Sequence, residues 1–266
     1  MRKNKDITLV LSGGGARGLA HIGVIEELNA QGYQIKSITG TSMGALVGGL
    51  YAMGKLEEFK LWVSKLNRYS VLRLLDFSFK SGGLIKGEKV LNLLRILIPG
   101  ENIENLQLPF QCVATDLQTQ QAVVFNSGKI YDAIHASIAI PGIFNPIQKG
   151  EMVLVDGGVL NNIPTQFAIK TSETDKILAV NANAKIPYGE IQHSHLSSNM
   201  SMFRISNRSI SLMMETIGNF NLKEYPADFM ISLSRYSCEL YEFYKAEQQI
   251  EYGRKVAREQ LSEYPF

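Results

Sequence analysis

The sequence predicts an α/β fold with a mostly parallel central sheet, and the first 46 residues contain the observations that predict it. An apolar run at 7–11 is typical of a buried parallel strand and leads directly into a glycine-rich loop at 13–18. Apolar residues at helical spacing follow over 19–28. A second run with β-branched residues ends at Gly40, where another helix-forming stretch begins. Strand, helix and strand in this order form a βαβ unit, whose two strands pair in parallel through a right-handed crossover.

The stretch from Gly40 to Gly44 has the pattern G-x-S-x-G and places Ser42 on the turn between a strand and a helix. Such a turn holds the serine in a cramped backbone conformation, and the two glycines remove Cβ atoms that would clash with neighbouring main chain. A hydroxyl at a helix N-terminus also lies near the positive end of the helix dipole, which favours an oxyanion beside it. Ser42 is therefore a candidate nucleophile. The pentapeptide alone fits a glycine- and serine-rich turn without chemistry equally well.

The glycine loop from Gly13 to Gly18 matches G-x-G-x-x-G, which has two uses. A dinucleotide site would need an acidic residue at the end of the second strand, about 20 residues on, and Gly40-Thr41-Ser42 stands there instead. Consecutive glycine N–H groups at a helix N-terminus also form a cradle for an oxyanion. Because loops at the carboxyl ends of neighbouring parallel strands lie at one edge of a sheet, we expect this loop to face Ser42.

Asp156 follows an apolar strand predicted at 152–155 and precedes Gly157 and Gly158, which clear space beside it. We expect its carboxylate to approach Ser42 and accept the hydroxyl proton. A carboxylate with an ordinary pKa near ~3.9 is a weak base for serine, so burial or close geometry must compensate. Taken alone, the same residues are typical of an ordinary Asp-Gly turn.

Four histidines offer an alternative base: His21, His135, His193 and His195. The chain order of an α/β-hydrolase triad would be met by Ser42, Asp156 and one of the last two. That fold places several strands before its nucleophile, whereas about two fit here. His193 and His195 also lie in a polar stretch at 185–200 that we expect to be an exposed loop. His21 and His135 are expected to be packed helix residues.

The composition is that of an ordinary soluble globular protein, with 266 residues, 45% hydrophobic residues and a formal charge of +2. We expect one domain over 1–266, with the motifs in 7–169 and with 170–266 completing the fold. The charge balance gives no indication of a nucleic-acid partner. Cys112 and Cys238 fit no disulfide framework, and no run has the ~20 apolar residues of a membrane span. A cytoplasmic protein that touches membranes only from the side is the expectation.

The remaining elements are predicted from apolar runs and periodicity. A hairpin of strands is expected at 110–114 and 121–125, further strands at 176–181 and 229–232, helices at 51–98, and a terminal helix at 239–262. The stretch 51–98 carries nine basic and four acidic residues, hence +5, together with Phe59, Trp62, Phe77 and Phe79. Aromatic and cationic side chains together suit a cap that docks on anionic membranes and admits a lipid to Ser42. A packed helical layer with solvated lysines is the alternative.

Three ordered blocks resemble those of the patatin-like phospholipases: Gly13-Gly14-Gly15-Ala16-Arg17-Gly18, Gly40-Thr41-Ser42-Met43-Gly44 and Asp156-Gly157-Gly158. The segment from Ala136 to Pro146 is similar to a fourth block of that family, and the resemblance covers about 7–169. It implies a three-layer α/β/α fold and hydrolysis of lipid acyl esters by a serine–aspartate dyad, with no cofactor and no metal. It assigns Ser42 as nucleophile, Asp156 as base, and the Gly13 to Gly18 loop, with Met43, as oxyanion hole. Ser12 departs from the acidic residue that plant members often have before the glycines.

Two rival functions remain open. One is a nucleotide-binding oxidoreductase that uses the glycine loop, and the other is a catalytically silent lipid-binding protein on the same fold. The missing acidic residue after the second strand argues against the first. The presence of both Ser42 and Asp156 argues against the second.

Overall fold

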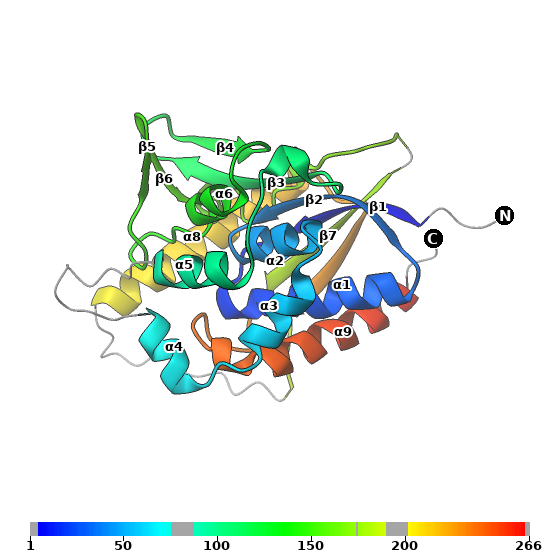
Figure 1. Ribbon diagram of the computed structural model, residues 1–266. Coiled ribbons are helices and arrows are strands. Elements are labelled where there is room, and N and C mark those ends of the chain that lie inside the picture. The colour runs from blue at the N-terminus through cyan, green and yellow to red at the C-terminus, as the bar shows by residue number, and fades with distance from the viewer. Residues whose placement is uncertain (1–4, 76–87, 174, 190–201, 264–266) are drawn as a thin grey trace.

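The computed structural model describes residues 5–75, 88–173, 175–189 and 202–263. Within these ranges the strands are β1 (Asp6–Leu11), β2 (Gln34–Thr41), β3 (Phe110–Asp116), β4 (Gln121–Phe125), β5 (Ile147–Lys149), β6 (Met152–Asp156), β7 (Lys176–Ala184) and β8 (Phe229–Ser234). They form one sheet in the order β5-β6-β3-β2-β1-β7-β8, and β4 pairs with β3 outside this path. Helices cover both faces of the sheet (Figure 1), which confirms the predicted three-layer α/β/α fold.

The centre of the sheet is parallel. β1 pairs in parallel with β2 and with β7, β2 with β3, and β7 with β8. The predicted βαβ unit is therefore confirmed, as is the antiparallel hairpin of β3 and β4. β5 and β6 join the sheet in antiparallel fashion at its β3 side.

Two strands meet end to end along one edge of β3. β2 runs parallel to β3 and ends with Thr41 opposite Val113, whereas β6 runs antiparallel and ends with Asp156 opposite Ala114. The other edge of β3 is occupied by β4 over the same residues, so β2 and β6 share the first edge. The ends of β2 and β6 are therefore brought together by successive residues of a third strand.

The layers bury alternate side chains of the strands. Ile7, Leu9 and Leu11 of β1 lie in the large core cluster with α1 (Ala20–Ala30), α2 (Met43–Ala52), α6 (Ile130–Ser137) and α9 (Ala246–Ser262). Val10 lies in a separate cluster on the opposite face, with Leu222 of α8 (Met202–Glu224) packed against it. The short α7 (Gly158–Asn161) packs against α8 on that face.

The described part of 51–98 forms three helices after the end of α2. They are α3 (Leu56–Val63), α4 (Arg68–Leu75) and α5 (Glu88–Leu97). Helix α3 contacts α2, and α5 contacts both α4 and α6. Phe77, Phe79 and Lys80 lie outside the described residues, as do His193 and His195. Among the helices that the structure describes, none has the length and apolar character needed to cross a bilayer.

In the C-terminal region one expectation is wrong, and one helix is not predicted. The terminal helix begins at Ala246 and is preceded by a 3-10 turn at Phe243–Lys245, so the predicted start at 239 is wrong. The long helix α8 is not predicted by the sequence, because it exposes large apolar residues such as Leu212 and Phe220 and its apolar period is therefore indistinct.

Candidate active site

Ser42 lies on a strained turn between β2 and α2. Its backbone angles are φ 54° and ψ −122°, a conformation that residues with a side chain rarely adopt. A Cβ on Gly40 would lie 2.5 Å from the Gly44 carbonyl oxygen, and one on Gly44 would lie 2.3 Å from the Leu11 carbonyl oxygen. The main chain therefore passes too closely for any residue but glycine at both positions. Ser42 itself is 5% exposed.

The Asp156 carboxyl group is fully buried beside Ser42. Burial raises its pKa to about 7, while the Ser42 hydroxyl and the Gly158 N–H act in the opposite direction. Oδ1 accepts a hydrogen bond from the Gly158 N–H at 2.7 Å, and Oδ2 has no hydrogen-bond partner of good geometry among the described residues. Oδ2 is therefore the carboxylate oxygen that can take a proton. A Cβ on Gly157 would lie 2.1 Å from the Val113 carbonyl oxygen, which explains the first glycine of this block.

The glycine loop lies against Ser42, as its position after β1 predicts. A Cβ on Gly13 would lie 3.1 Å from the Cβ of Ser42. The Gly13 N–H donates to the Asn162 carbonyl at 3.0 Å, and the Ala16 N–H donates to the Leu240 carbonyl at 2.9 Å. Among the described residues, the N–H groups of Gly14 and Gly15 have no acceptor. Both of these loop donors are therefore available to a bound oxyanion.

Two further contacts shape the loop. Gly15 has a φ of +55°, in the left-handed region that favours glycine, and its Cα lies against Leu240. A Cβ on Gly18 would lie 2.5 Å from Cγ of Met43, so this glycine lets the start of α2 pack onto the loop. The predicted site residues are thus brought together: Gly13, Gly14, Gly15, Ala16, Arg17, Gly18, Gly40, Ser42, Met43, Gly44, Asp156, Gly157 and Gly158.

Arg17 is a largely enclosed cation within this loop. Its Nε donates to the Gly14 carbonyl at 3.2 Å, and its guanidinium also donates to the Arg235 carbonyl at 3.1 Å. Burial lowers the pKa of Arg17, and its side chain makes no ion pair with a carboxylate in the part of the chain that the structure describes. An enclosed guanidinium without a paired anion is suited to an anionic group on a ligand.

Two cavities meet at Ser42. The first is apolar, and α3, α4 and α5 supply Trp62, Val71 and Leu94 to its wall. The second is lined by Arg17, Asn162, Asn183, Glu215 and Arg235, the last two joined in an ion pair. Ser42 and Gly15 line both cavities. A ligand that reaches Ser42 can therefore place an apolar part on one side and a polar part on the other.

Several residues of the site are not indicated by the sequence. Asn183 of β7 donates from Nδ2 to the Gly13 carbonyl at 2.6 Å, and Leu240 holds the loop from the segment before α9. Asn162 follows Asp156 by six residues and so is the only one of the three near a recognised motif. The contacts of Asn183 and Leu240 span about 170 residues or more, and no local pattern reveals them.

The described histidines pack as expected. His21 of α1 is fully buried and donates from Nε2 to the Ser12 carbonyl at 2.9 Å. Burial lowers its pKa to about 4, although the hydrogen bond to Ser12 raises it, so the ring is neutral at physiological pH. Neither His21 nor His135, the two histidines in the described ranges, lines a cavity with Ser42.

Comparisons with known proteins identify the family of the chain. The family model of patatin-like phospholipases matches residues 9–169. An uncharacterized NTE family protein of Mycobacterium tuberculosis is 30% identical across 97% of this chain and 92% of its own length. A lysophospholipase of Emericella nidulans is 31% identical across 67% of this chain and 12% of its own length.

Solved structures show the same fold at low identity. VipD from Legionella pneumophila superposes with a TM-score of 0.52 at 16% identity, covering 98% of this chain and 67% of VipD. The ExoU–SpcU complex of Pseudomonas aeruginosa superposes with a TM-score of 0.53 at 18% identity, covering 97% of this chain and 51% of the matched one. With the family model matched over the segment that contains Ser42 and Asp156, the chain belongs to the patatin-like phospholipase family.

Proposed function

We propose that this protein hydrolyses an acyl ester of a lipid, with Ser42 as nucleophile and Asp156 as the base that accepts its proton. Membership of the patatin-like phospholipase family supports lipid hydrolysis in general. The observation that carries the assignment is that Ser42, on its strained turn, lies beside the buried carboxyl group of Asp156. Burial raises the pKa of this carboxyl group to about 7. A base is most effective when its pKa lies near the working pH.

The proposed reaction uses only groups at the meeting point of the two cavities. Ser42 Oγ attacks the ester carbonyl carbon as its proton passes to Asp156 Oδ2. The N–H groups of Gly14, Gly15 and Met43 stabilise the negative oxygen of the tetrahedral intermediate. The intermediate collapses, the alcohol leaves with the proton from Asp156, and an acyl-serine remains. Water then attacks the acyl-serine, giving up a proton to Asp156. Asp156 returns this proton to Ser42 Oγ as the acyl–oxygen bond breaks, and the fatty acid is released.

The cavities favour a substrate with one acyl chain and a polar, anionic alcohol part. The apolar cavity accepts the acyl chain, and the second cavity accepts the leaving alcohol, with Arg17 and Arg235 facing a phosphate. A lysophospholipid has this chemistry. A triacylglycerol or sterol ester would place a second apolar group against Arg17 and Asn162, where their polar atoms would lose hydration without replacement.

A fluorophosphonate probe tests the nucleophile. We expect covalent labelling of the wild type at the peptide that contains Ser42, and neither labelling nor turnover in Ser42→Ala. Loss of a nucleophile lowers kcat by several orders of magnitude. A protein that binds lipid without catalysis, or one that binds a dinucleotide, would remain unlabelled.

The same assay separates the dyad from a triad. Asp156→Asn should be about as damaging as Ser42→Ala, whereas the double variant His193→Ala/His195→Ala should keep near wild-type turnover. In a triad the histidine acts as the base, so its loss would be crippling. If the double histidine variant lost its turnover, one of these histidines and not Asp156 would be the base.

A further inference from the structure

The turn that ends α6 contacts the main chain of both proposed catalytic residues. Ser137, the last residue of α6, is fully buried, and its Oγ accepts a hydrogen bond from the Ser42 N–H at 2.9 Å. Two residues later, the Ala139 carbonyl accepts a hydrogen bond from the Asp156 N–H at 2.8 Å. One short segment therefore holds the two residues that must exchange a proton.

The contact with Ser42 supports a conformation that needs support. Backbone conformations such as φ 54°, ψ −122° are unfavourable in a residue with a side chain and persist only where the surroundings hold them. The carbonyl of Ser42 already serves α2, accepting from the Leu46 N–H at 3.1 Å. Its N–H is held by Ser137, whose removal would leave this buried donor unpaired.

The orientation of the Ser137 hydroxyl is fixed as well. It donates its own proton to the Val113 carbonyl at 2.6 Å, so its lone pairs remain for the Ser42 N–H. Val113 is the residue of β3 at which β2 ends, next to Ala114, where β6 ends. Ser137 is thus tied to the strand that sets the spacing of the site.

We infer that Ser137 is a positioning residue, which holds the Ser42 turn so that the Ser42 hydroxyl stays within reach of Asp156. The inference rests on the proposed serine–aspartate dyad. Ser137 acts through the main chain of Ser42, and it lines neither of the two cavities that meet at Ser42. Its loss should therefore slow the chemical step and leave substrate binding unchanged.

The test compares Ser137→Ala with Ser37→Ala. Ser37 is also fully buried, belongs to β2, and donates its hydroxyl proton to the Ile169 carbonyl at the end of the strand remote from Ser42. Both changes remove one buried hydroxyl that donates to a carbonyl, and the Ile169 carbonyl keeps the Thr8 hydroxyl as a donor at 2.9 Å. On a soluble short-chain ester, Ser137→Ala should lower kcat by about 10²-fold, the scale of a displaced reacting group, with KM within twofold of wild type. Ser37→Ala should leave both constants within twofold.

The pH profile and the labelling rate complete the test. In Ser137→Ala the rate of fluorophosphonate labelling should fall together with kcat, and the pH midpoint of kcat should stay at or above that of wild type, because Asp156 remains buried. A folded Ser137→Ala with kcat within threefold of wild type would overturn the inference. So would a midpoint shifted toward that of a hydrated aspartate, which would indicate a generally loosened site.

A second variant covers the case in which Ser137→Ala does not fold. Ser137→Cys keeps nearly the same volume but offers only a weak acceptor, so it should be folded and slow, whereas full activity would overturn the inference. Failure of the wild type to label at Ser42 would instead remove the proposed function, so the two failures are distinguishable.

Discussion

At the scale of single residues, the environment of Asp156 should set the pH dependence of the proposed reaction. In that proposal the ionised form accepts the Ser42 proton, and burial raises the pKa of Asp156 to about 7. We predict that kcat on a soluble short-chain ester rises with pH and levels off above about 7. A rate profile between pH 5 and 9 measures this. A midpoint near that of a hydrated aspartate would contradict the role of burial.

Burial of the ionised Asp156 carboxylate also lowers the free energy of unfolding, which leads to a second prediction. Because the folded protein holds the proton of Asp156 more tightly than the unfolded chain, ionisation destabilises the fold progressively from pH 3.8 to about 7. Asp156→Asn removes the charge. Its Tm should match that of wild type near pH 4 and exceed it at pH 8, where the gain in unfolding free energy is at most a few kcal/mol at ~1.4 kcal/mol per pKa unit. Thermal denaturation of both proteins at pH 4 and pH 8 measures the difference in Tm. Equal Tm values at pH 8 would show that burial of the ionised carboxylate does not destabilise the fold.

Sequence patterns predict the residues of the site but not the contacts that hold them. Ser42 and Gly44 belong to one local turn, and local backbone sterics explain each of them. Ser137 is 95 residues from Ser42, and its hydroxyl reaches the Ser42 N–H only because α6 packs on the end of β3. Such a contact depends on tertiary packing, which no short pattern encodes.

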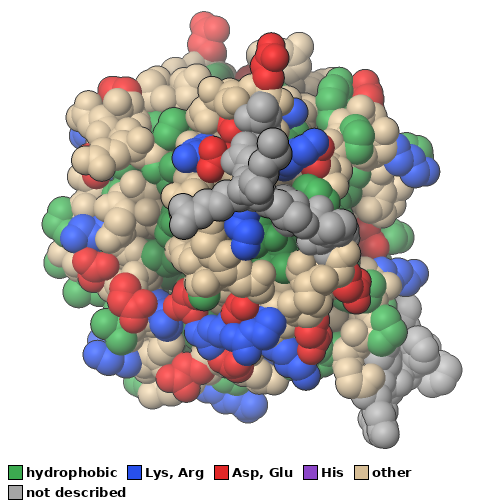
Figure 2. All heavy atoms as spheres, turned by 90° about the vertical axis from the view of Figure 1, so that its right-hand side faces the viewer, with side chains coloured by type: hydrophobic (Ala, Val, Ile, Leu, Met, Phe, Trp, Pro, Cys, Tyr) green, Lys and Arg blue, Asp and Glu red, His purple; other side chains and the backbone are tan. Residues whose placement is uncertain are grey.

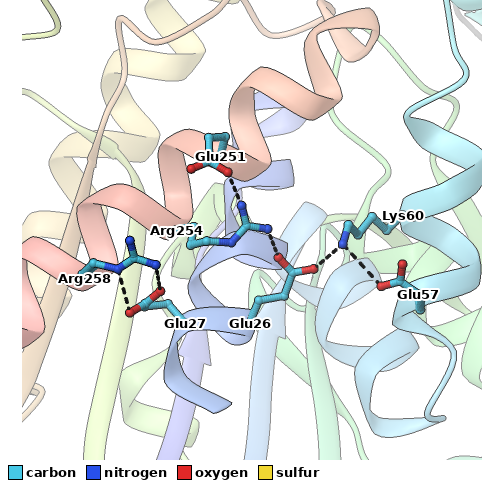
Figure 3. A network of polar contacts seen from close by, with 7 residues as sticks. All are labelled: Glu26, Glu27, Glu57, Lys60, Glu251, Arg254 and Arg258. Carbon is cyan, nitrogen blue, oxygen red and sulfur yellow. Dashed lines mark hydrogen bonds and ion pairs between the residues drawn. The ribbon is translucent and has the colours of Figure 1, made fainter. Parts of the chain in front are cut away.

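At the scale of elements, ion pairs attach the cap helix α3 to the body of the protein (Figure 3). Glu26 of α1 pairs with Lys60 of α3 at 2.6 Å and with Arg254 of α9, and Lys60 also reaches Glu57 at 3.4 Å. Burial raises the pKa of Glu26, but Lys60 and Arg254 together hold it below its usual value. The Lys60 ammonium group therefore ties α3 to α1 and is shared between two carboxylates.

A third prediction follows from this network. Glu26→Gln leaves Lys60 and Arg254 without their shared anion, so it should lower the free energy of unfolding by about 1 kcal/mol, as expected for a partly buried network. Glu58→Gln is the matched control, because Glu58 only pairs with Lys55 on the exposed surface of the same helix. Denaturant unfolding of both variants at low salt measures the difference. Equal stability of the two would show that the network contributes nothing beyond an ordinary surface pair.

Predictability also differs among elements. β1 contains a continuous apolar run, and β2 contains β-branched residues before a glycine motif, so both strands are predicted beside the motifs that follow them. α8 could not be predicted, because its exposed apolar residues leave the sequence without a clear helical period of apolar positions. The start of α9 is displaced because Leu240 leaves helical periodicity to cover the glycine loop.

At the scale of the whole molecule, the surface differs from one side to another. Figure 2 shows acidic and basic side chains interspersed on the face that lies to the right in Figure 1. Large exposed apolar residues occur on α4 and α5, at the left of Figure 1, including Tyr69, Leu72 and Ile96. Phe59 and Trp62, expected to face the membrane, line the apolar cavity instead, and Arg68 lies over the Tyr244 ring.

The fourth prediction is that the outer faces of α4 and α5 meet lipid. The double variant Tyr69→Ser/Leu72→Ser should hydrolyse lysophospholipid in anionic vesicles several-fold more slowly than wild type, because apolar side chains that enter the interface contribute to binding. Activity on a soluble short-chain ester should not change. Leu117→Ser, which removes a similarly exposed leucine after β3, is the control. Equal vesicle activity of the double variant and this control would exclude the surface from lipid contact.

The meeting of β2 and β6 on β3 also bears on how such a protein can be altered. Thr41 and Asp156 face successive residues of β3, so the distance between the proposed nucleophile and base is independent of the length of chain that joins them. The helices over 56–97 could be lengthened, shortened or exchanged as one unit, and the repertoire of hydrolysed lipids would change while the reacting pair stayed in place. One residue inserted between Val113 and Ala114 would instead disturb the reacting pair. It would either create a bulge in β3 or rotate every later side chain of this strand to the other face of the sheet.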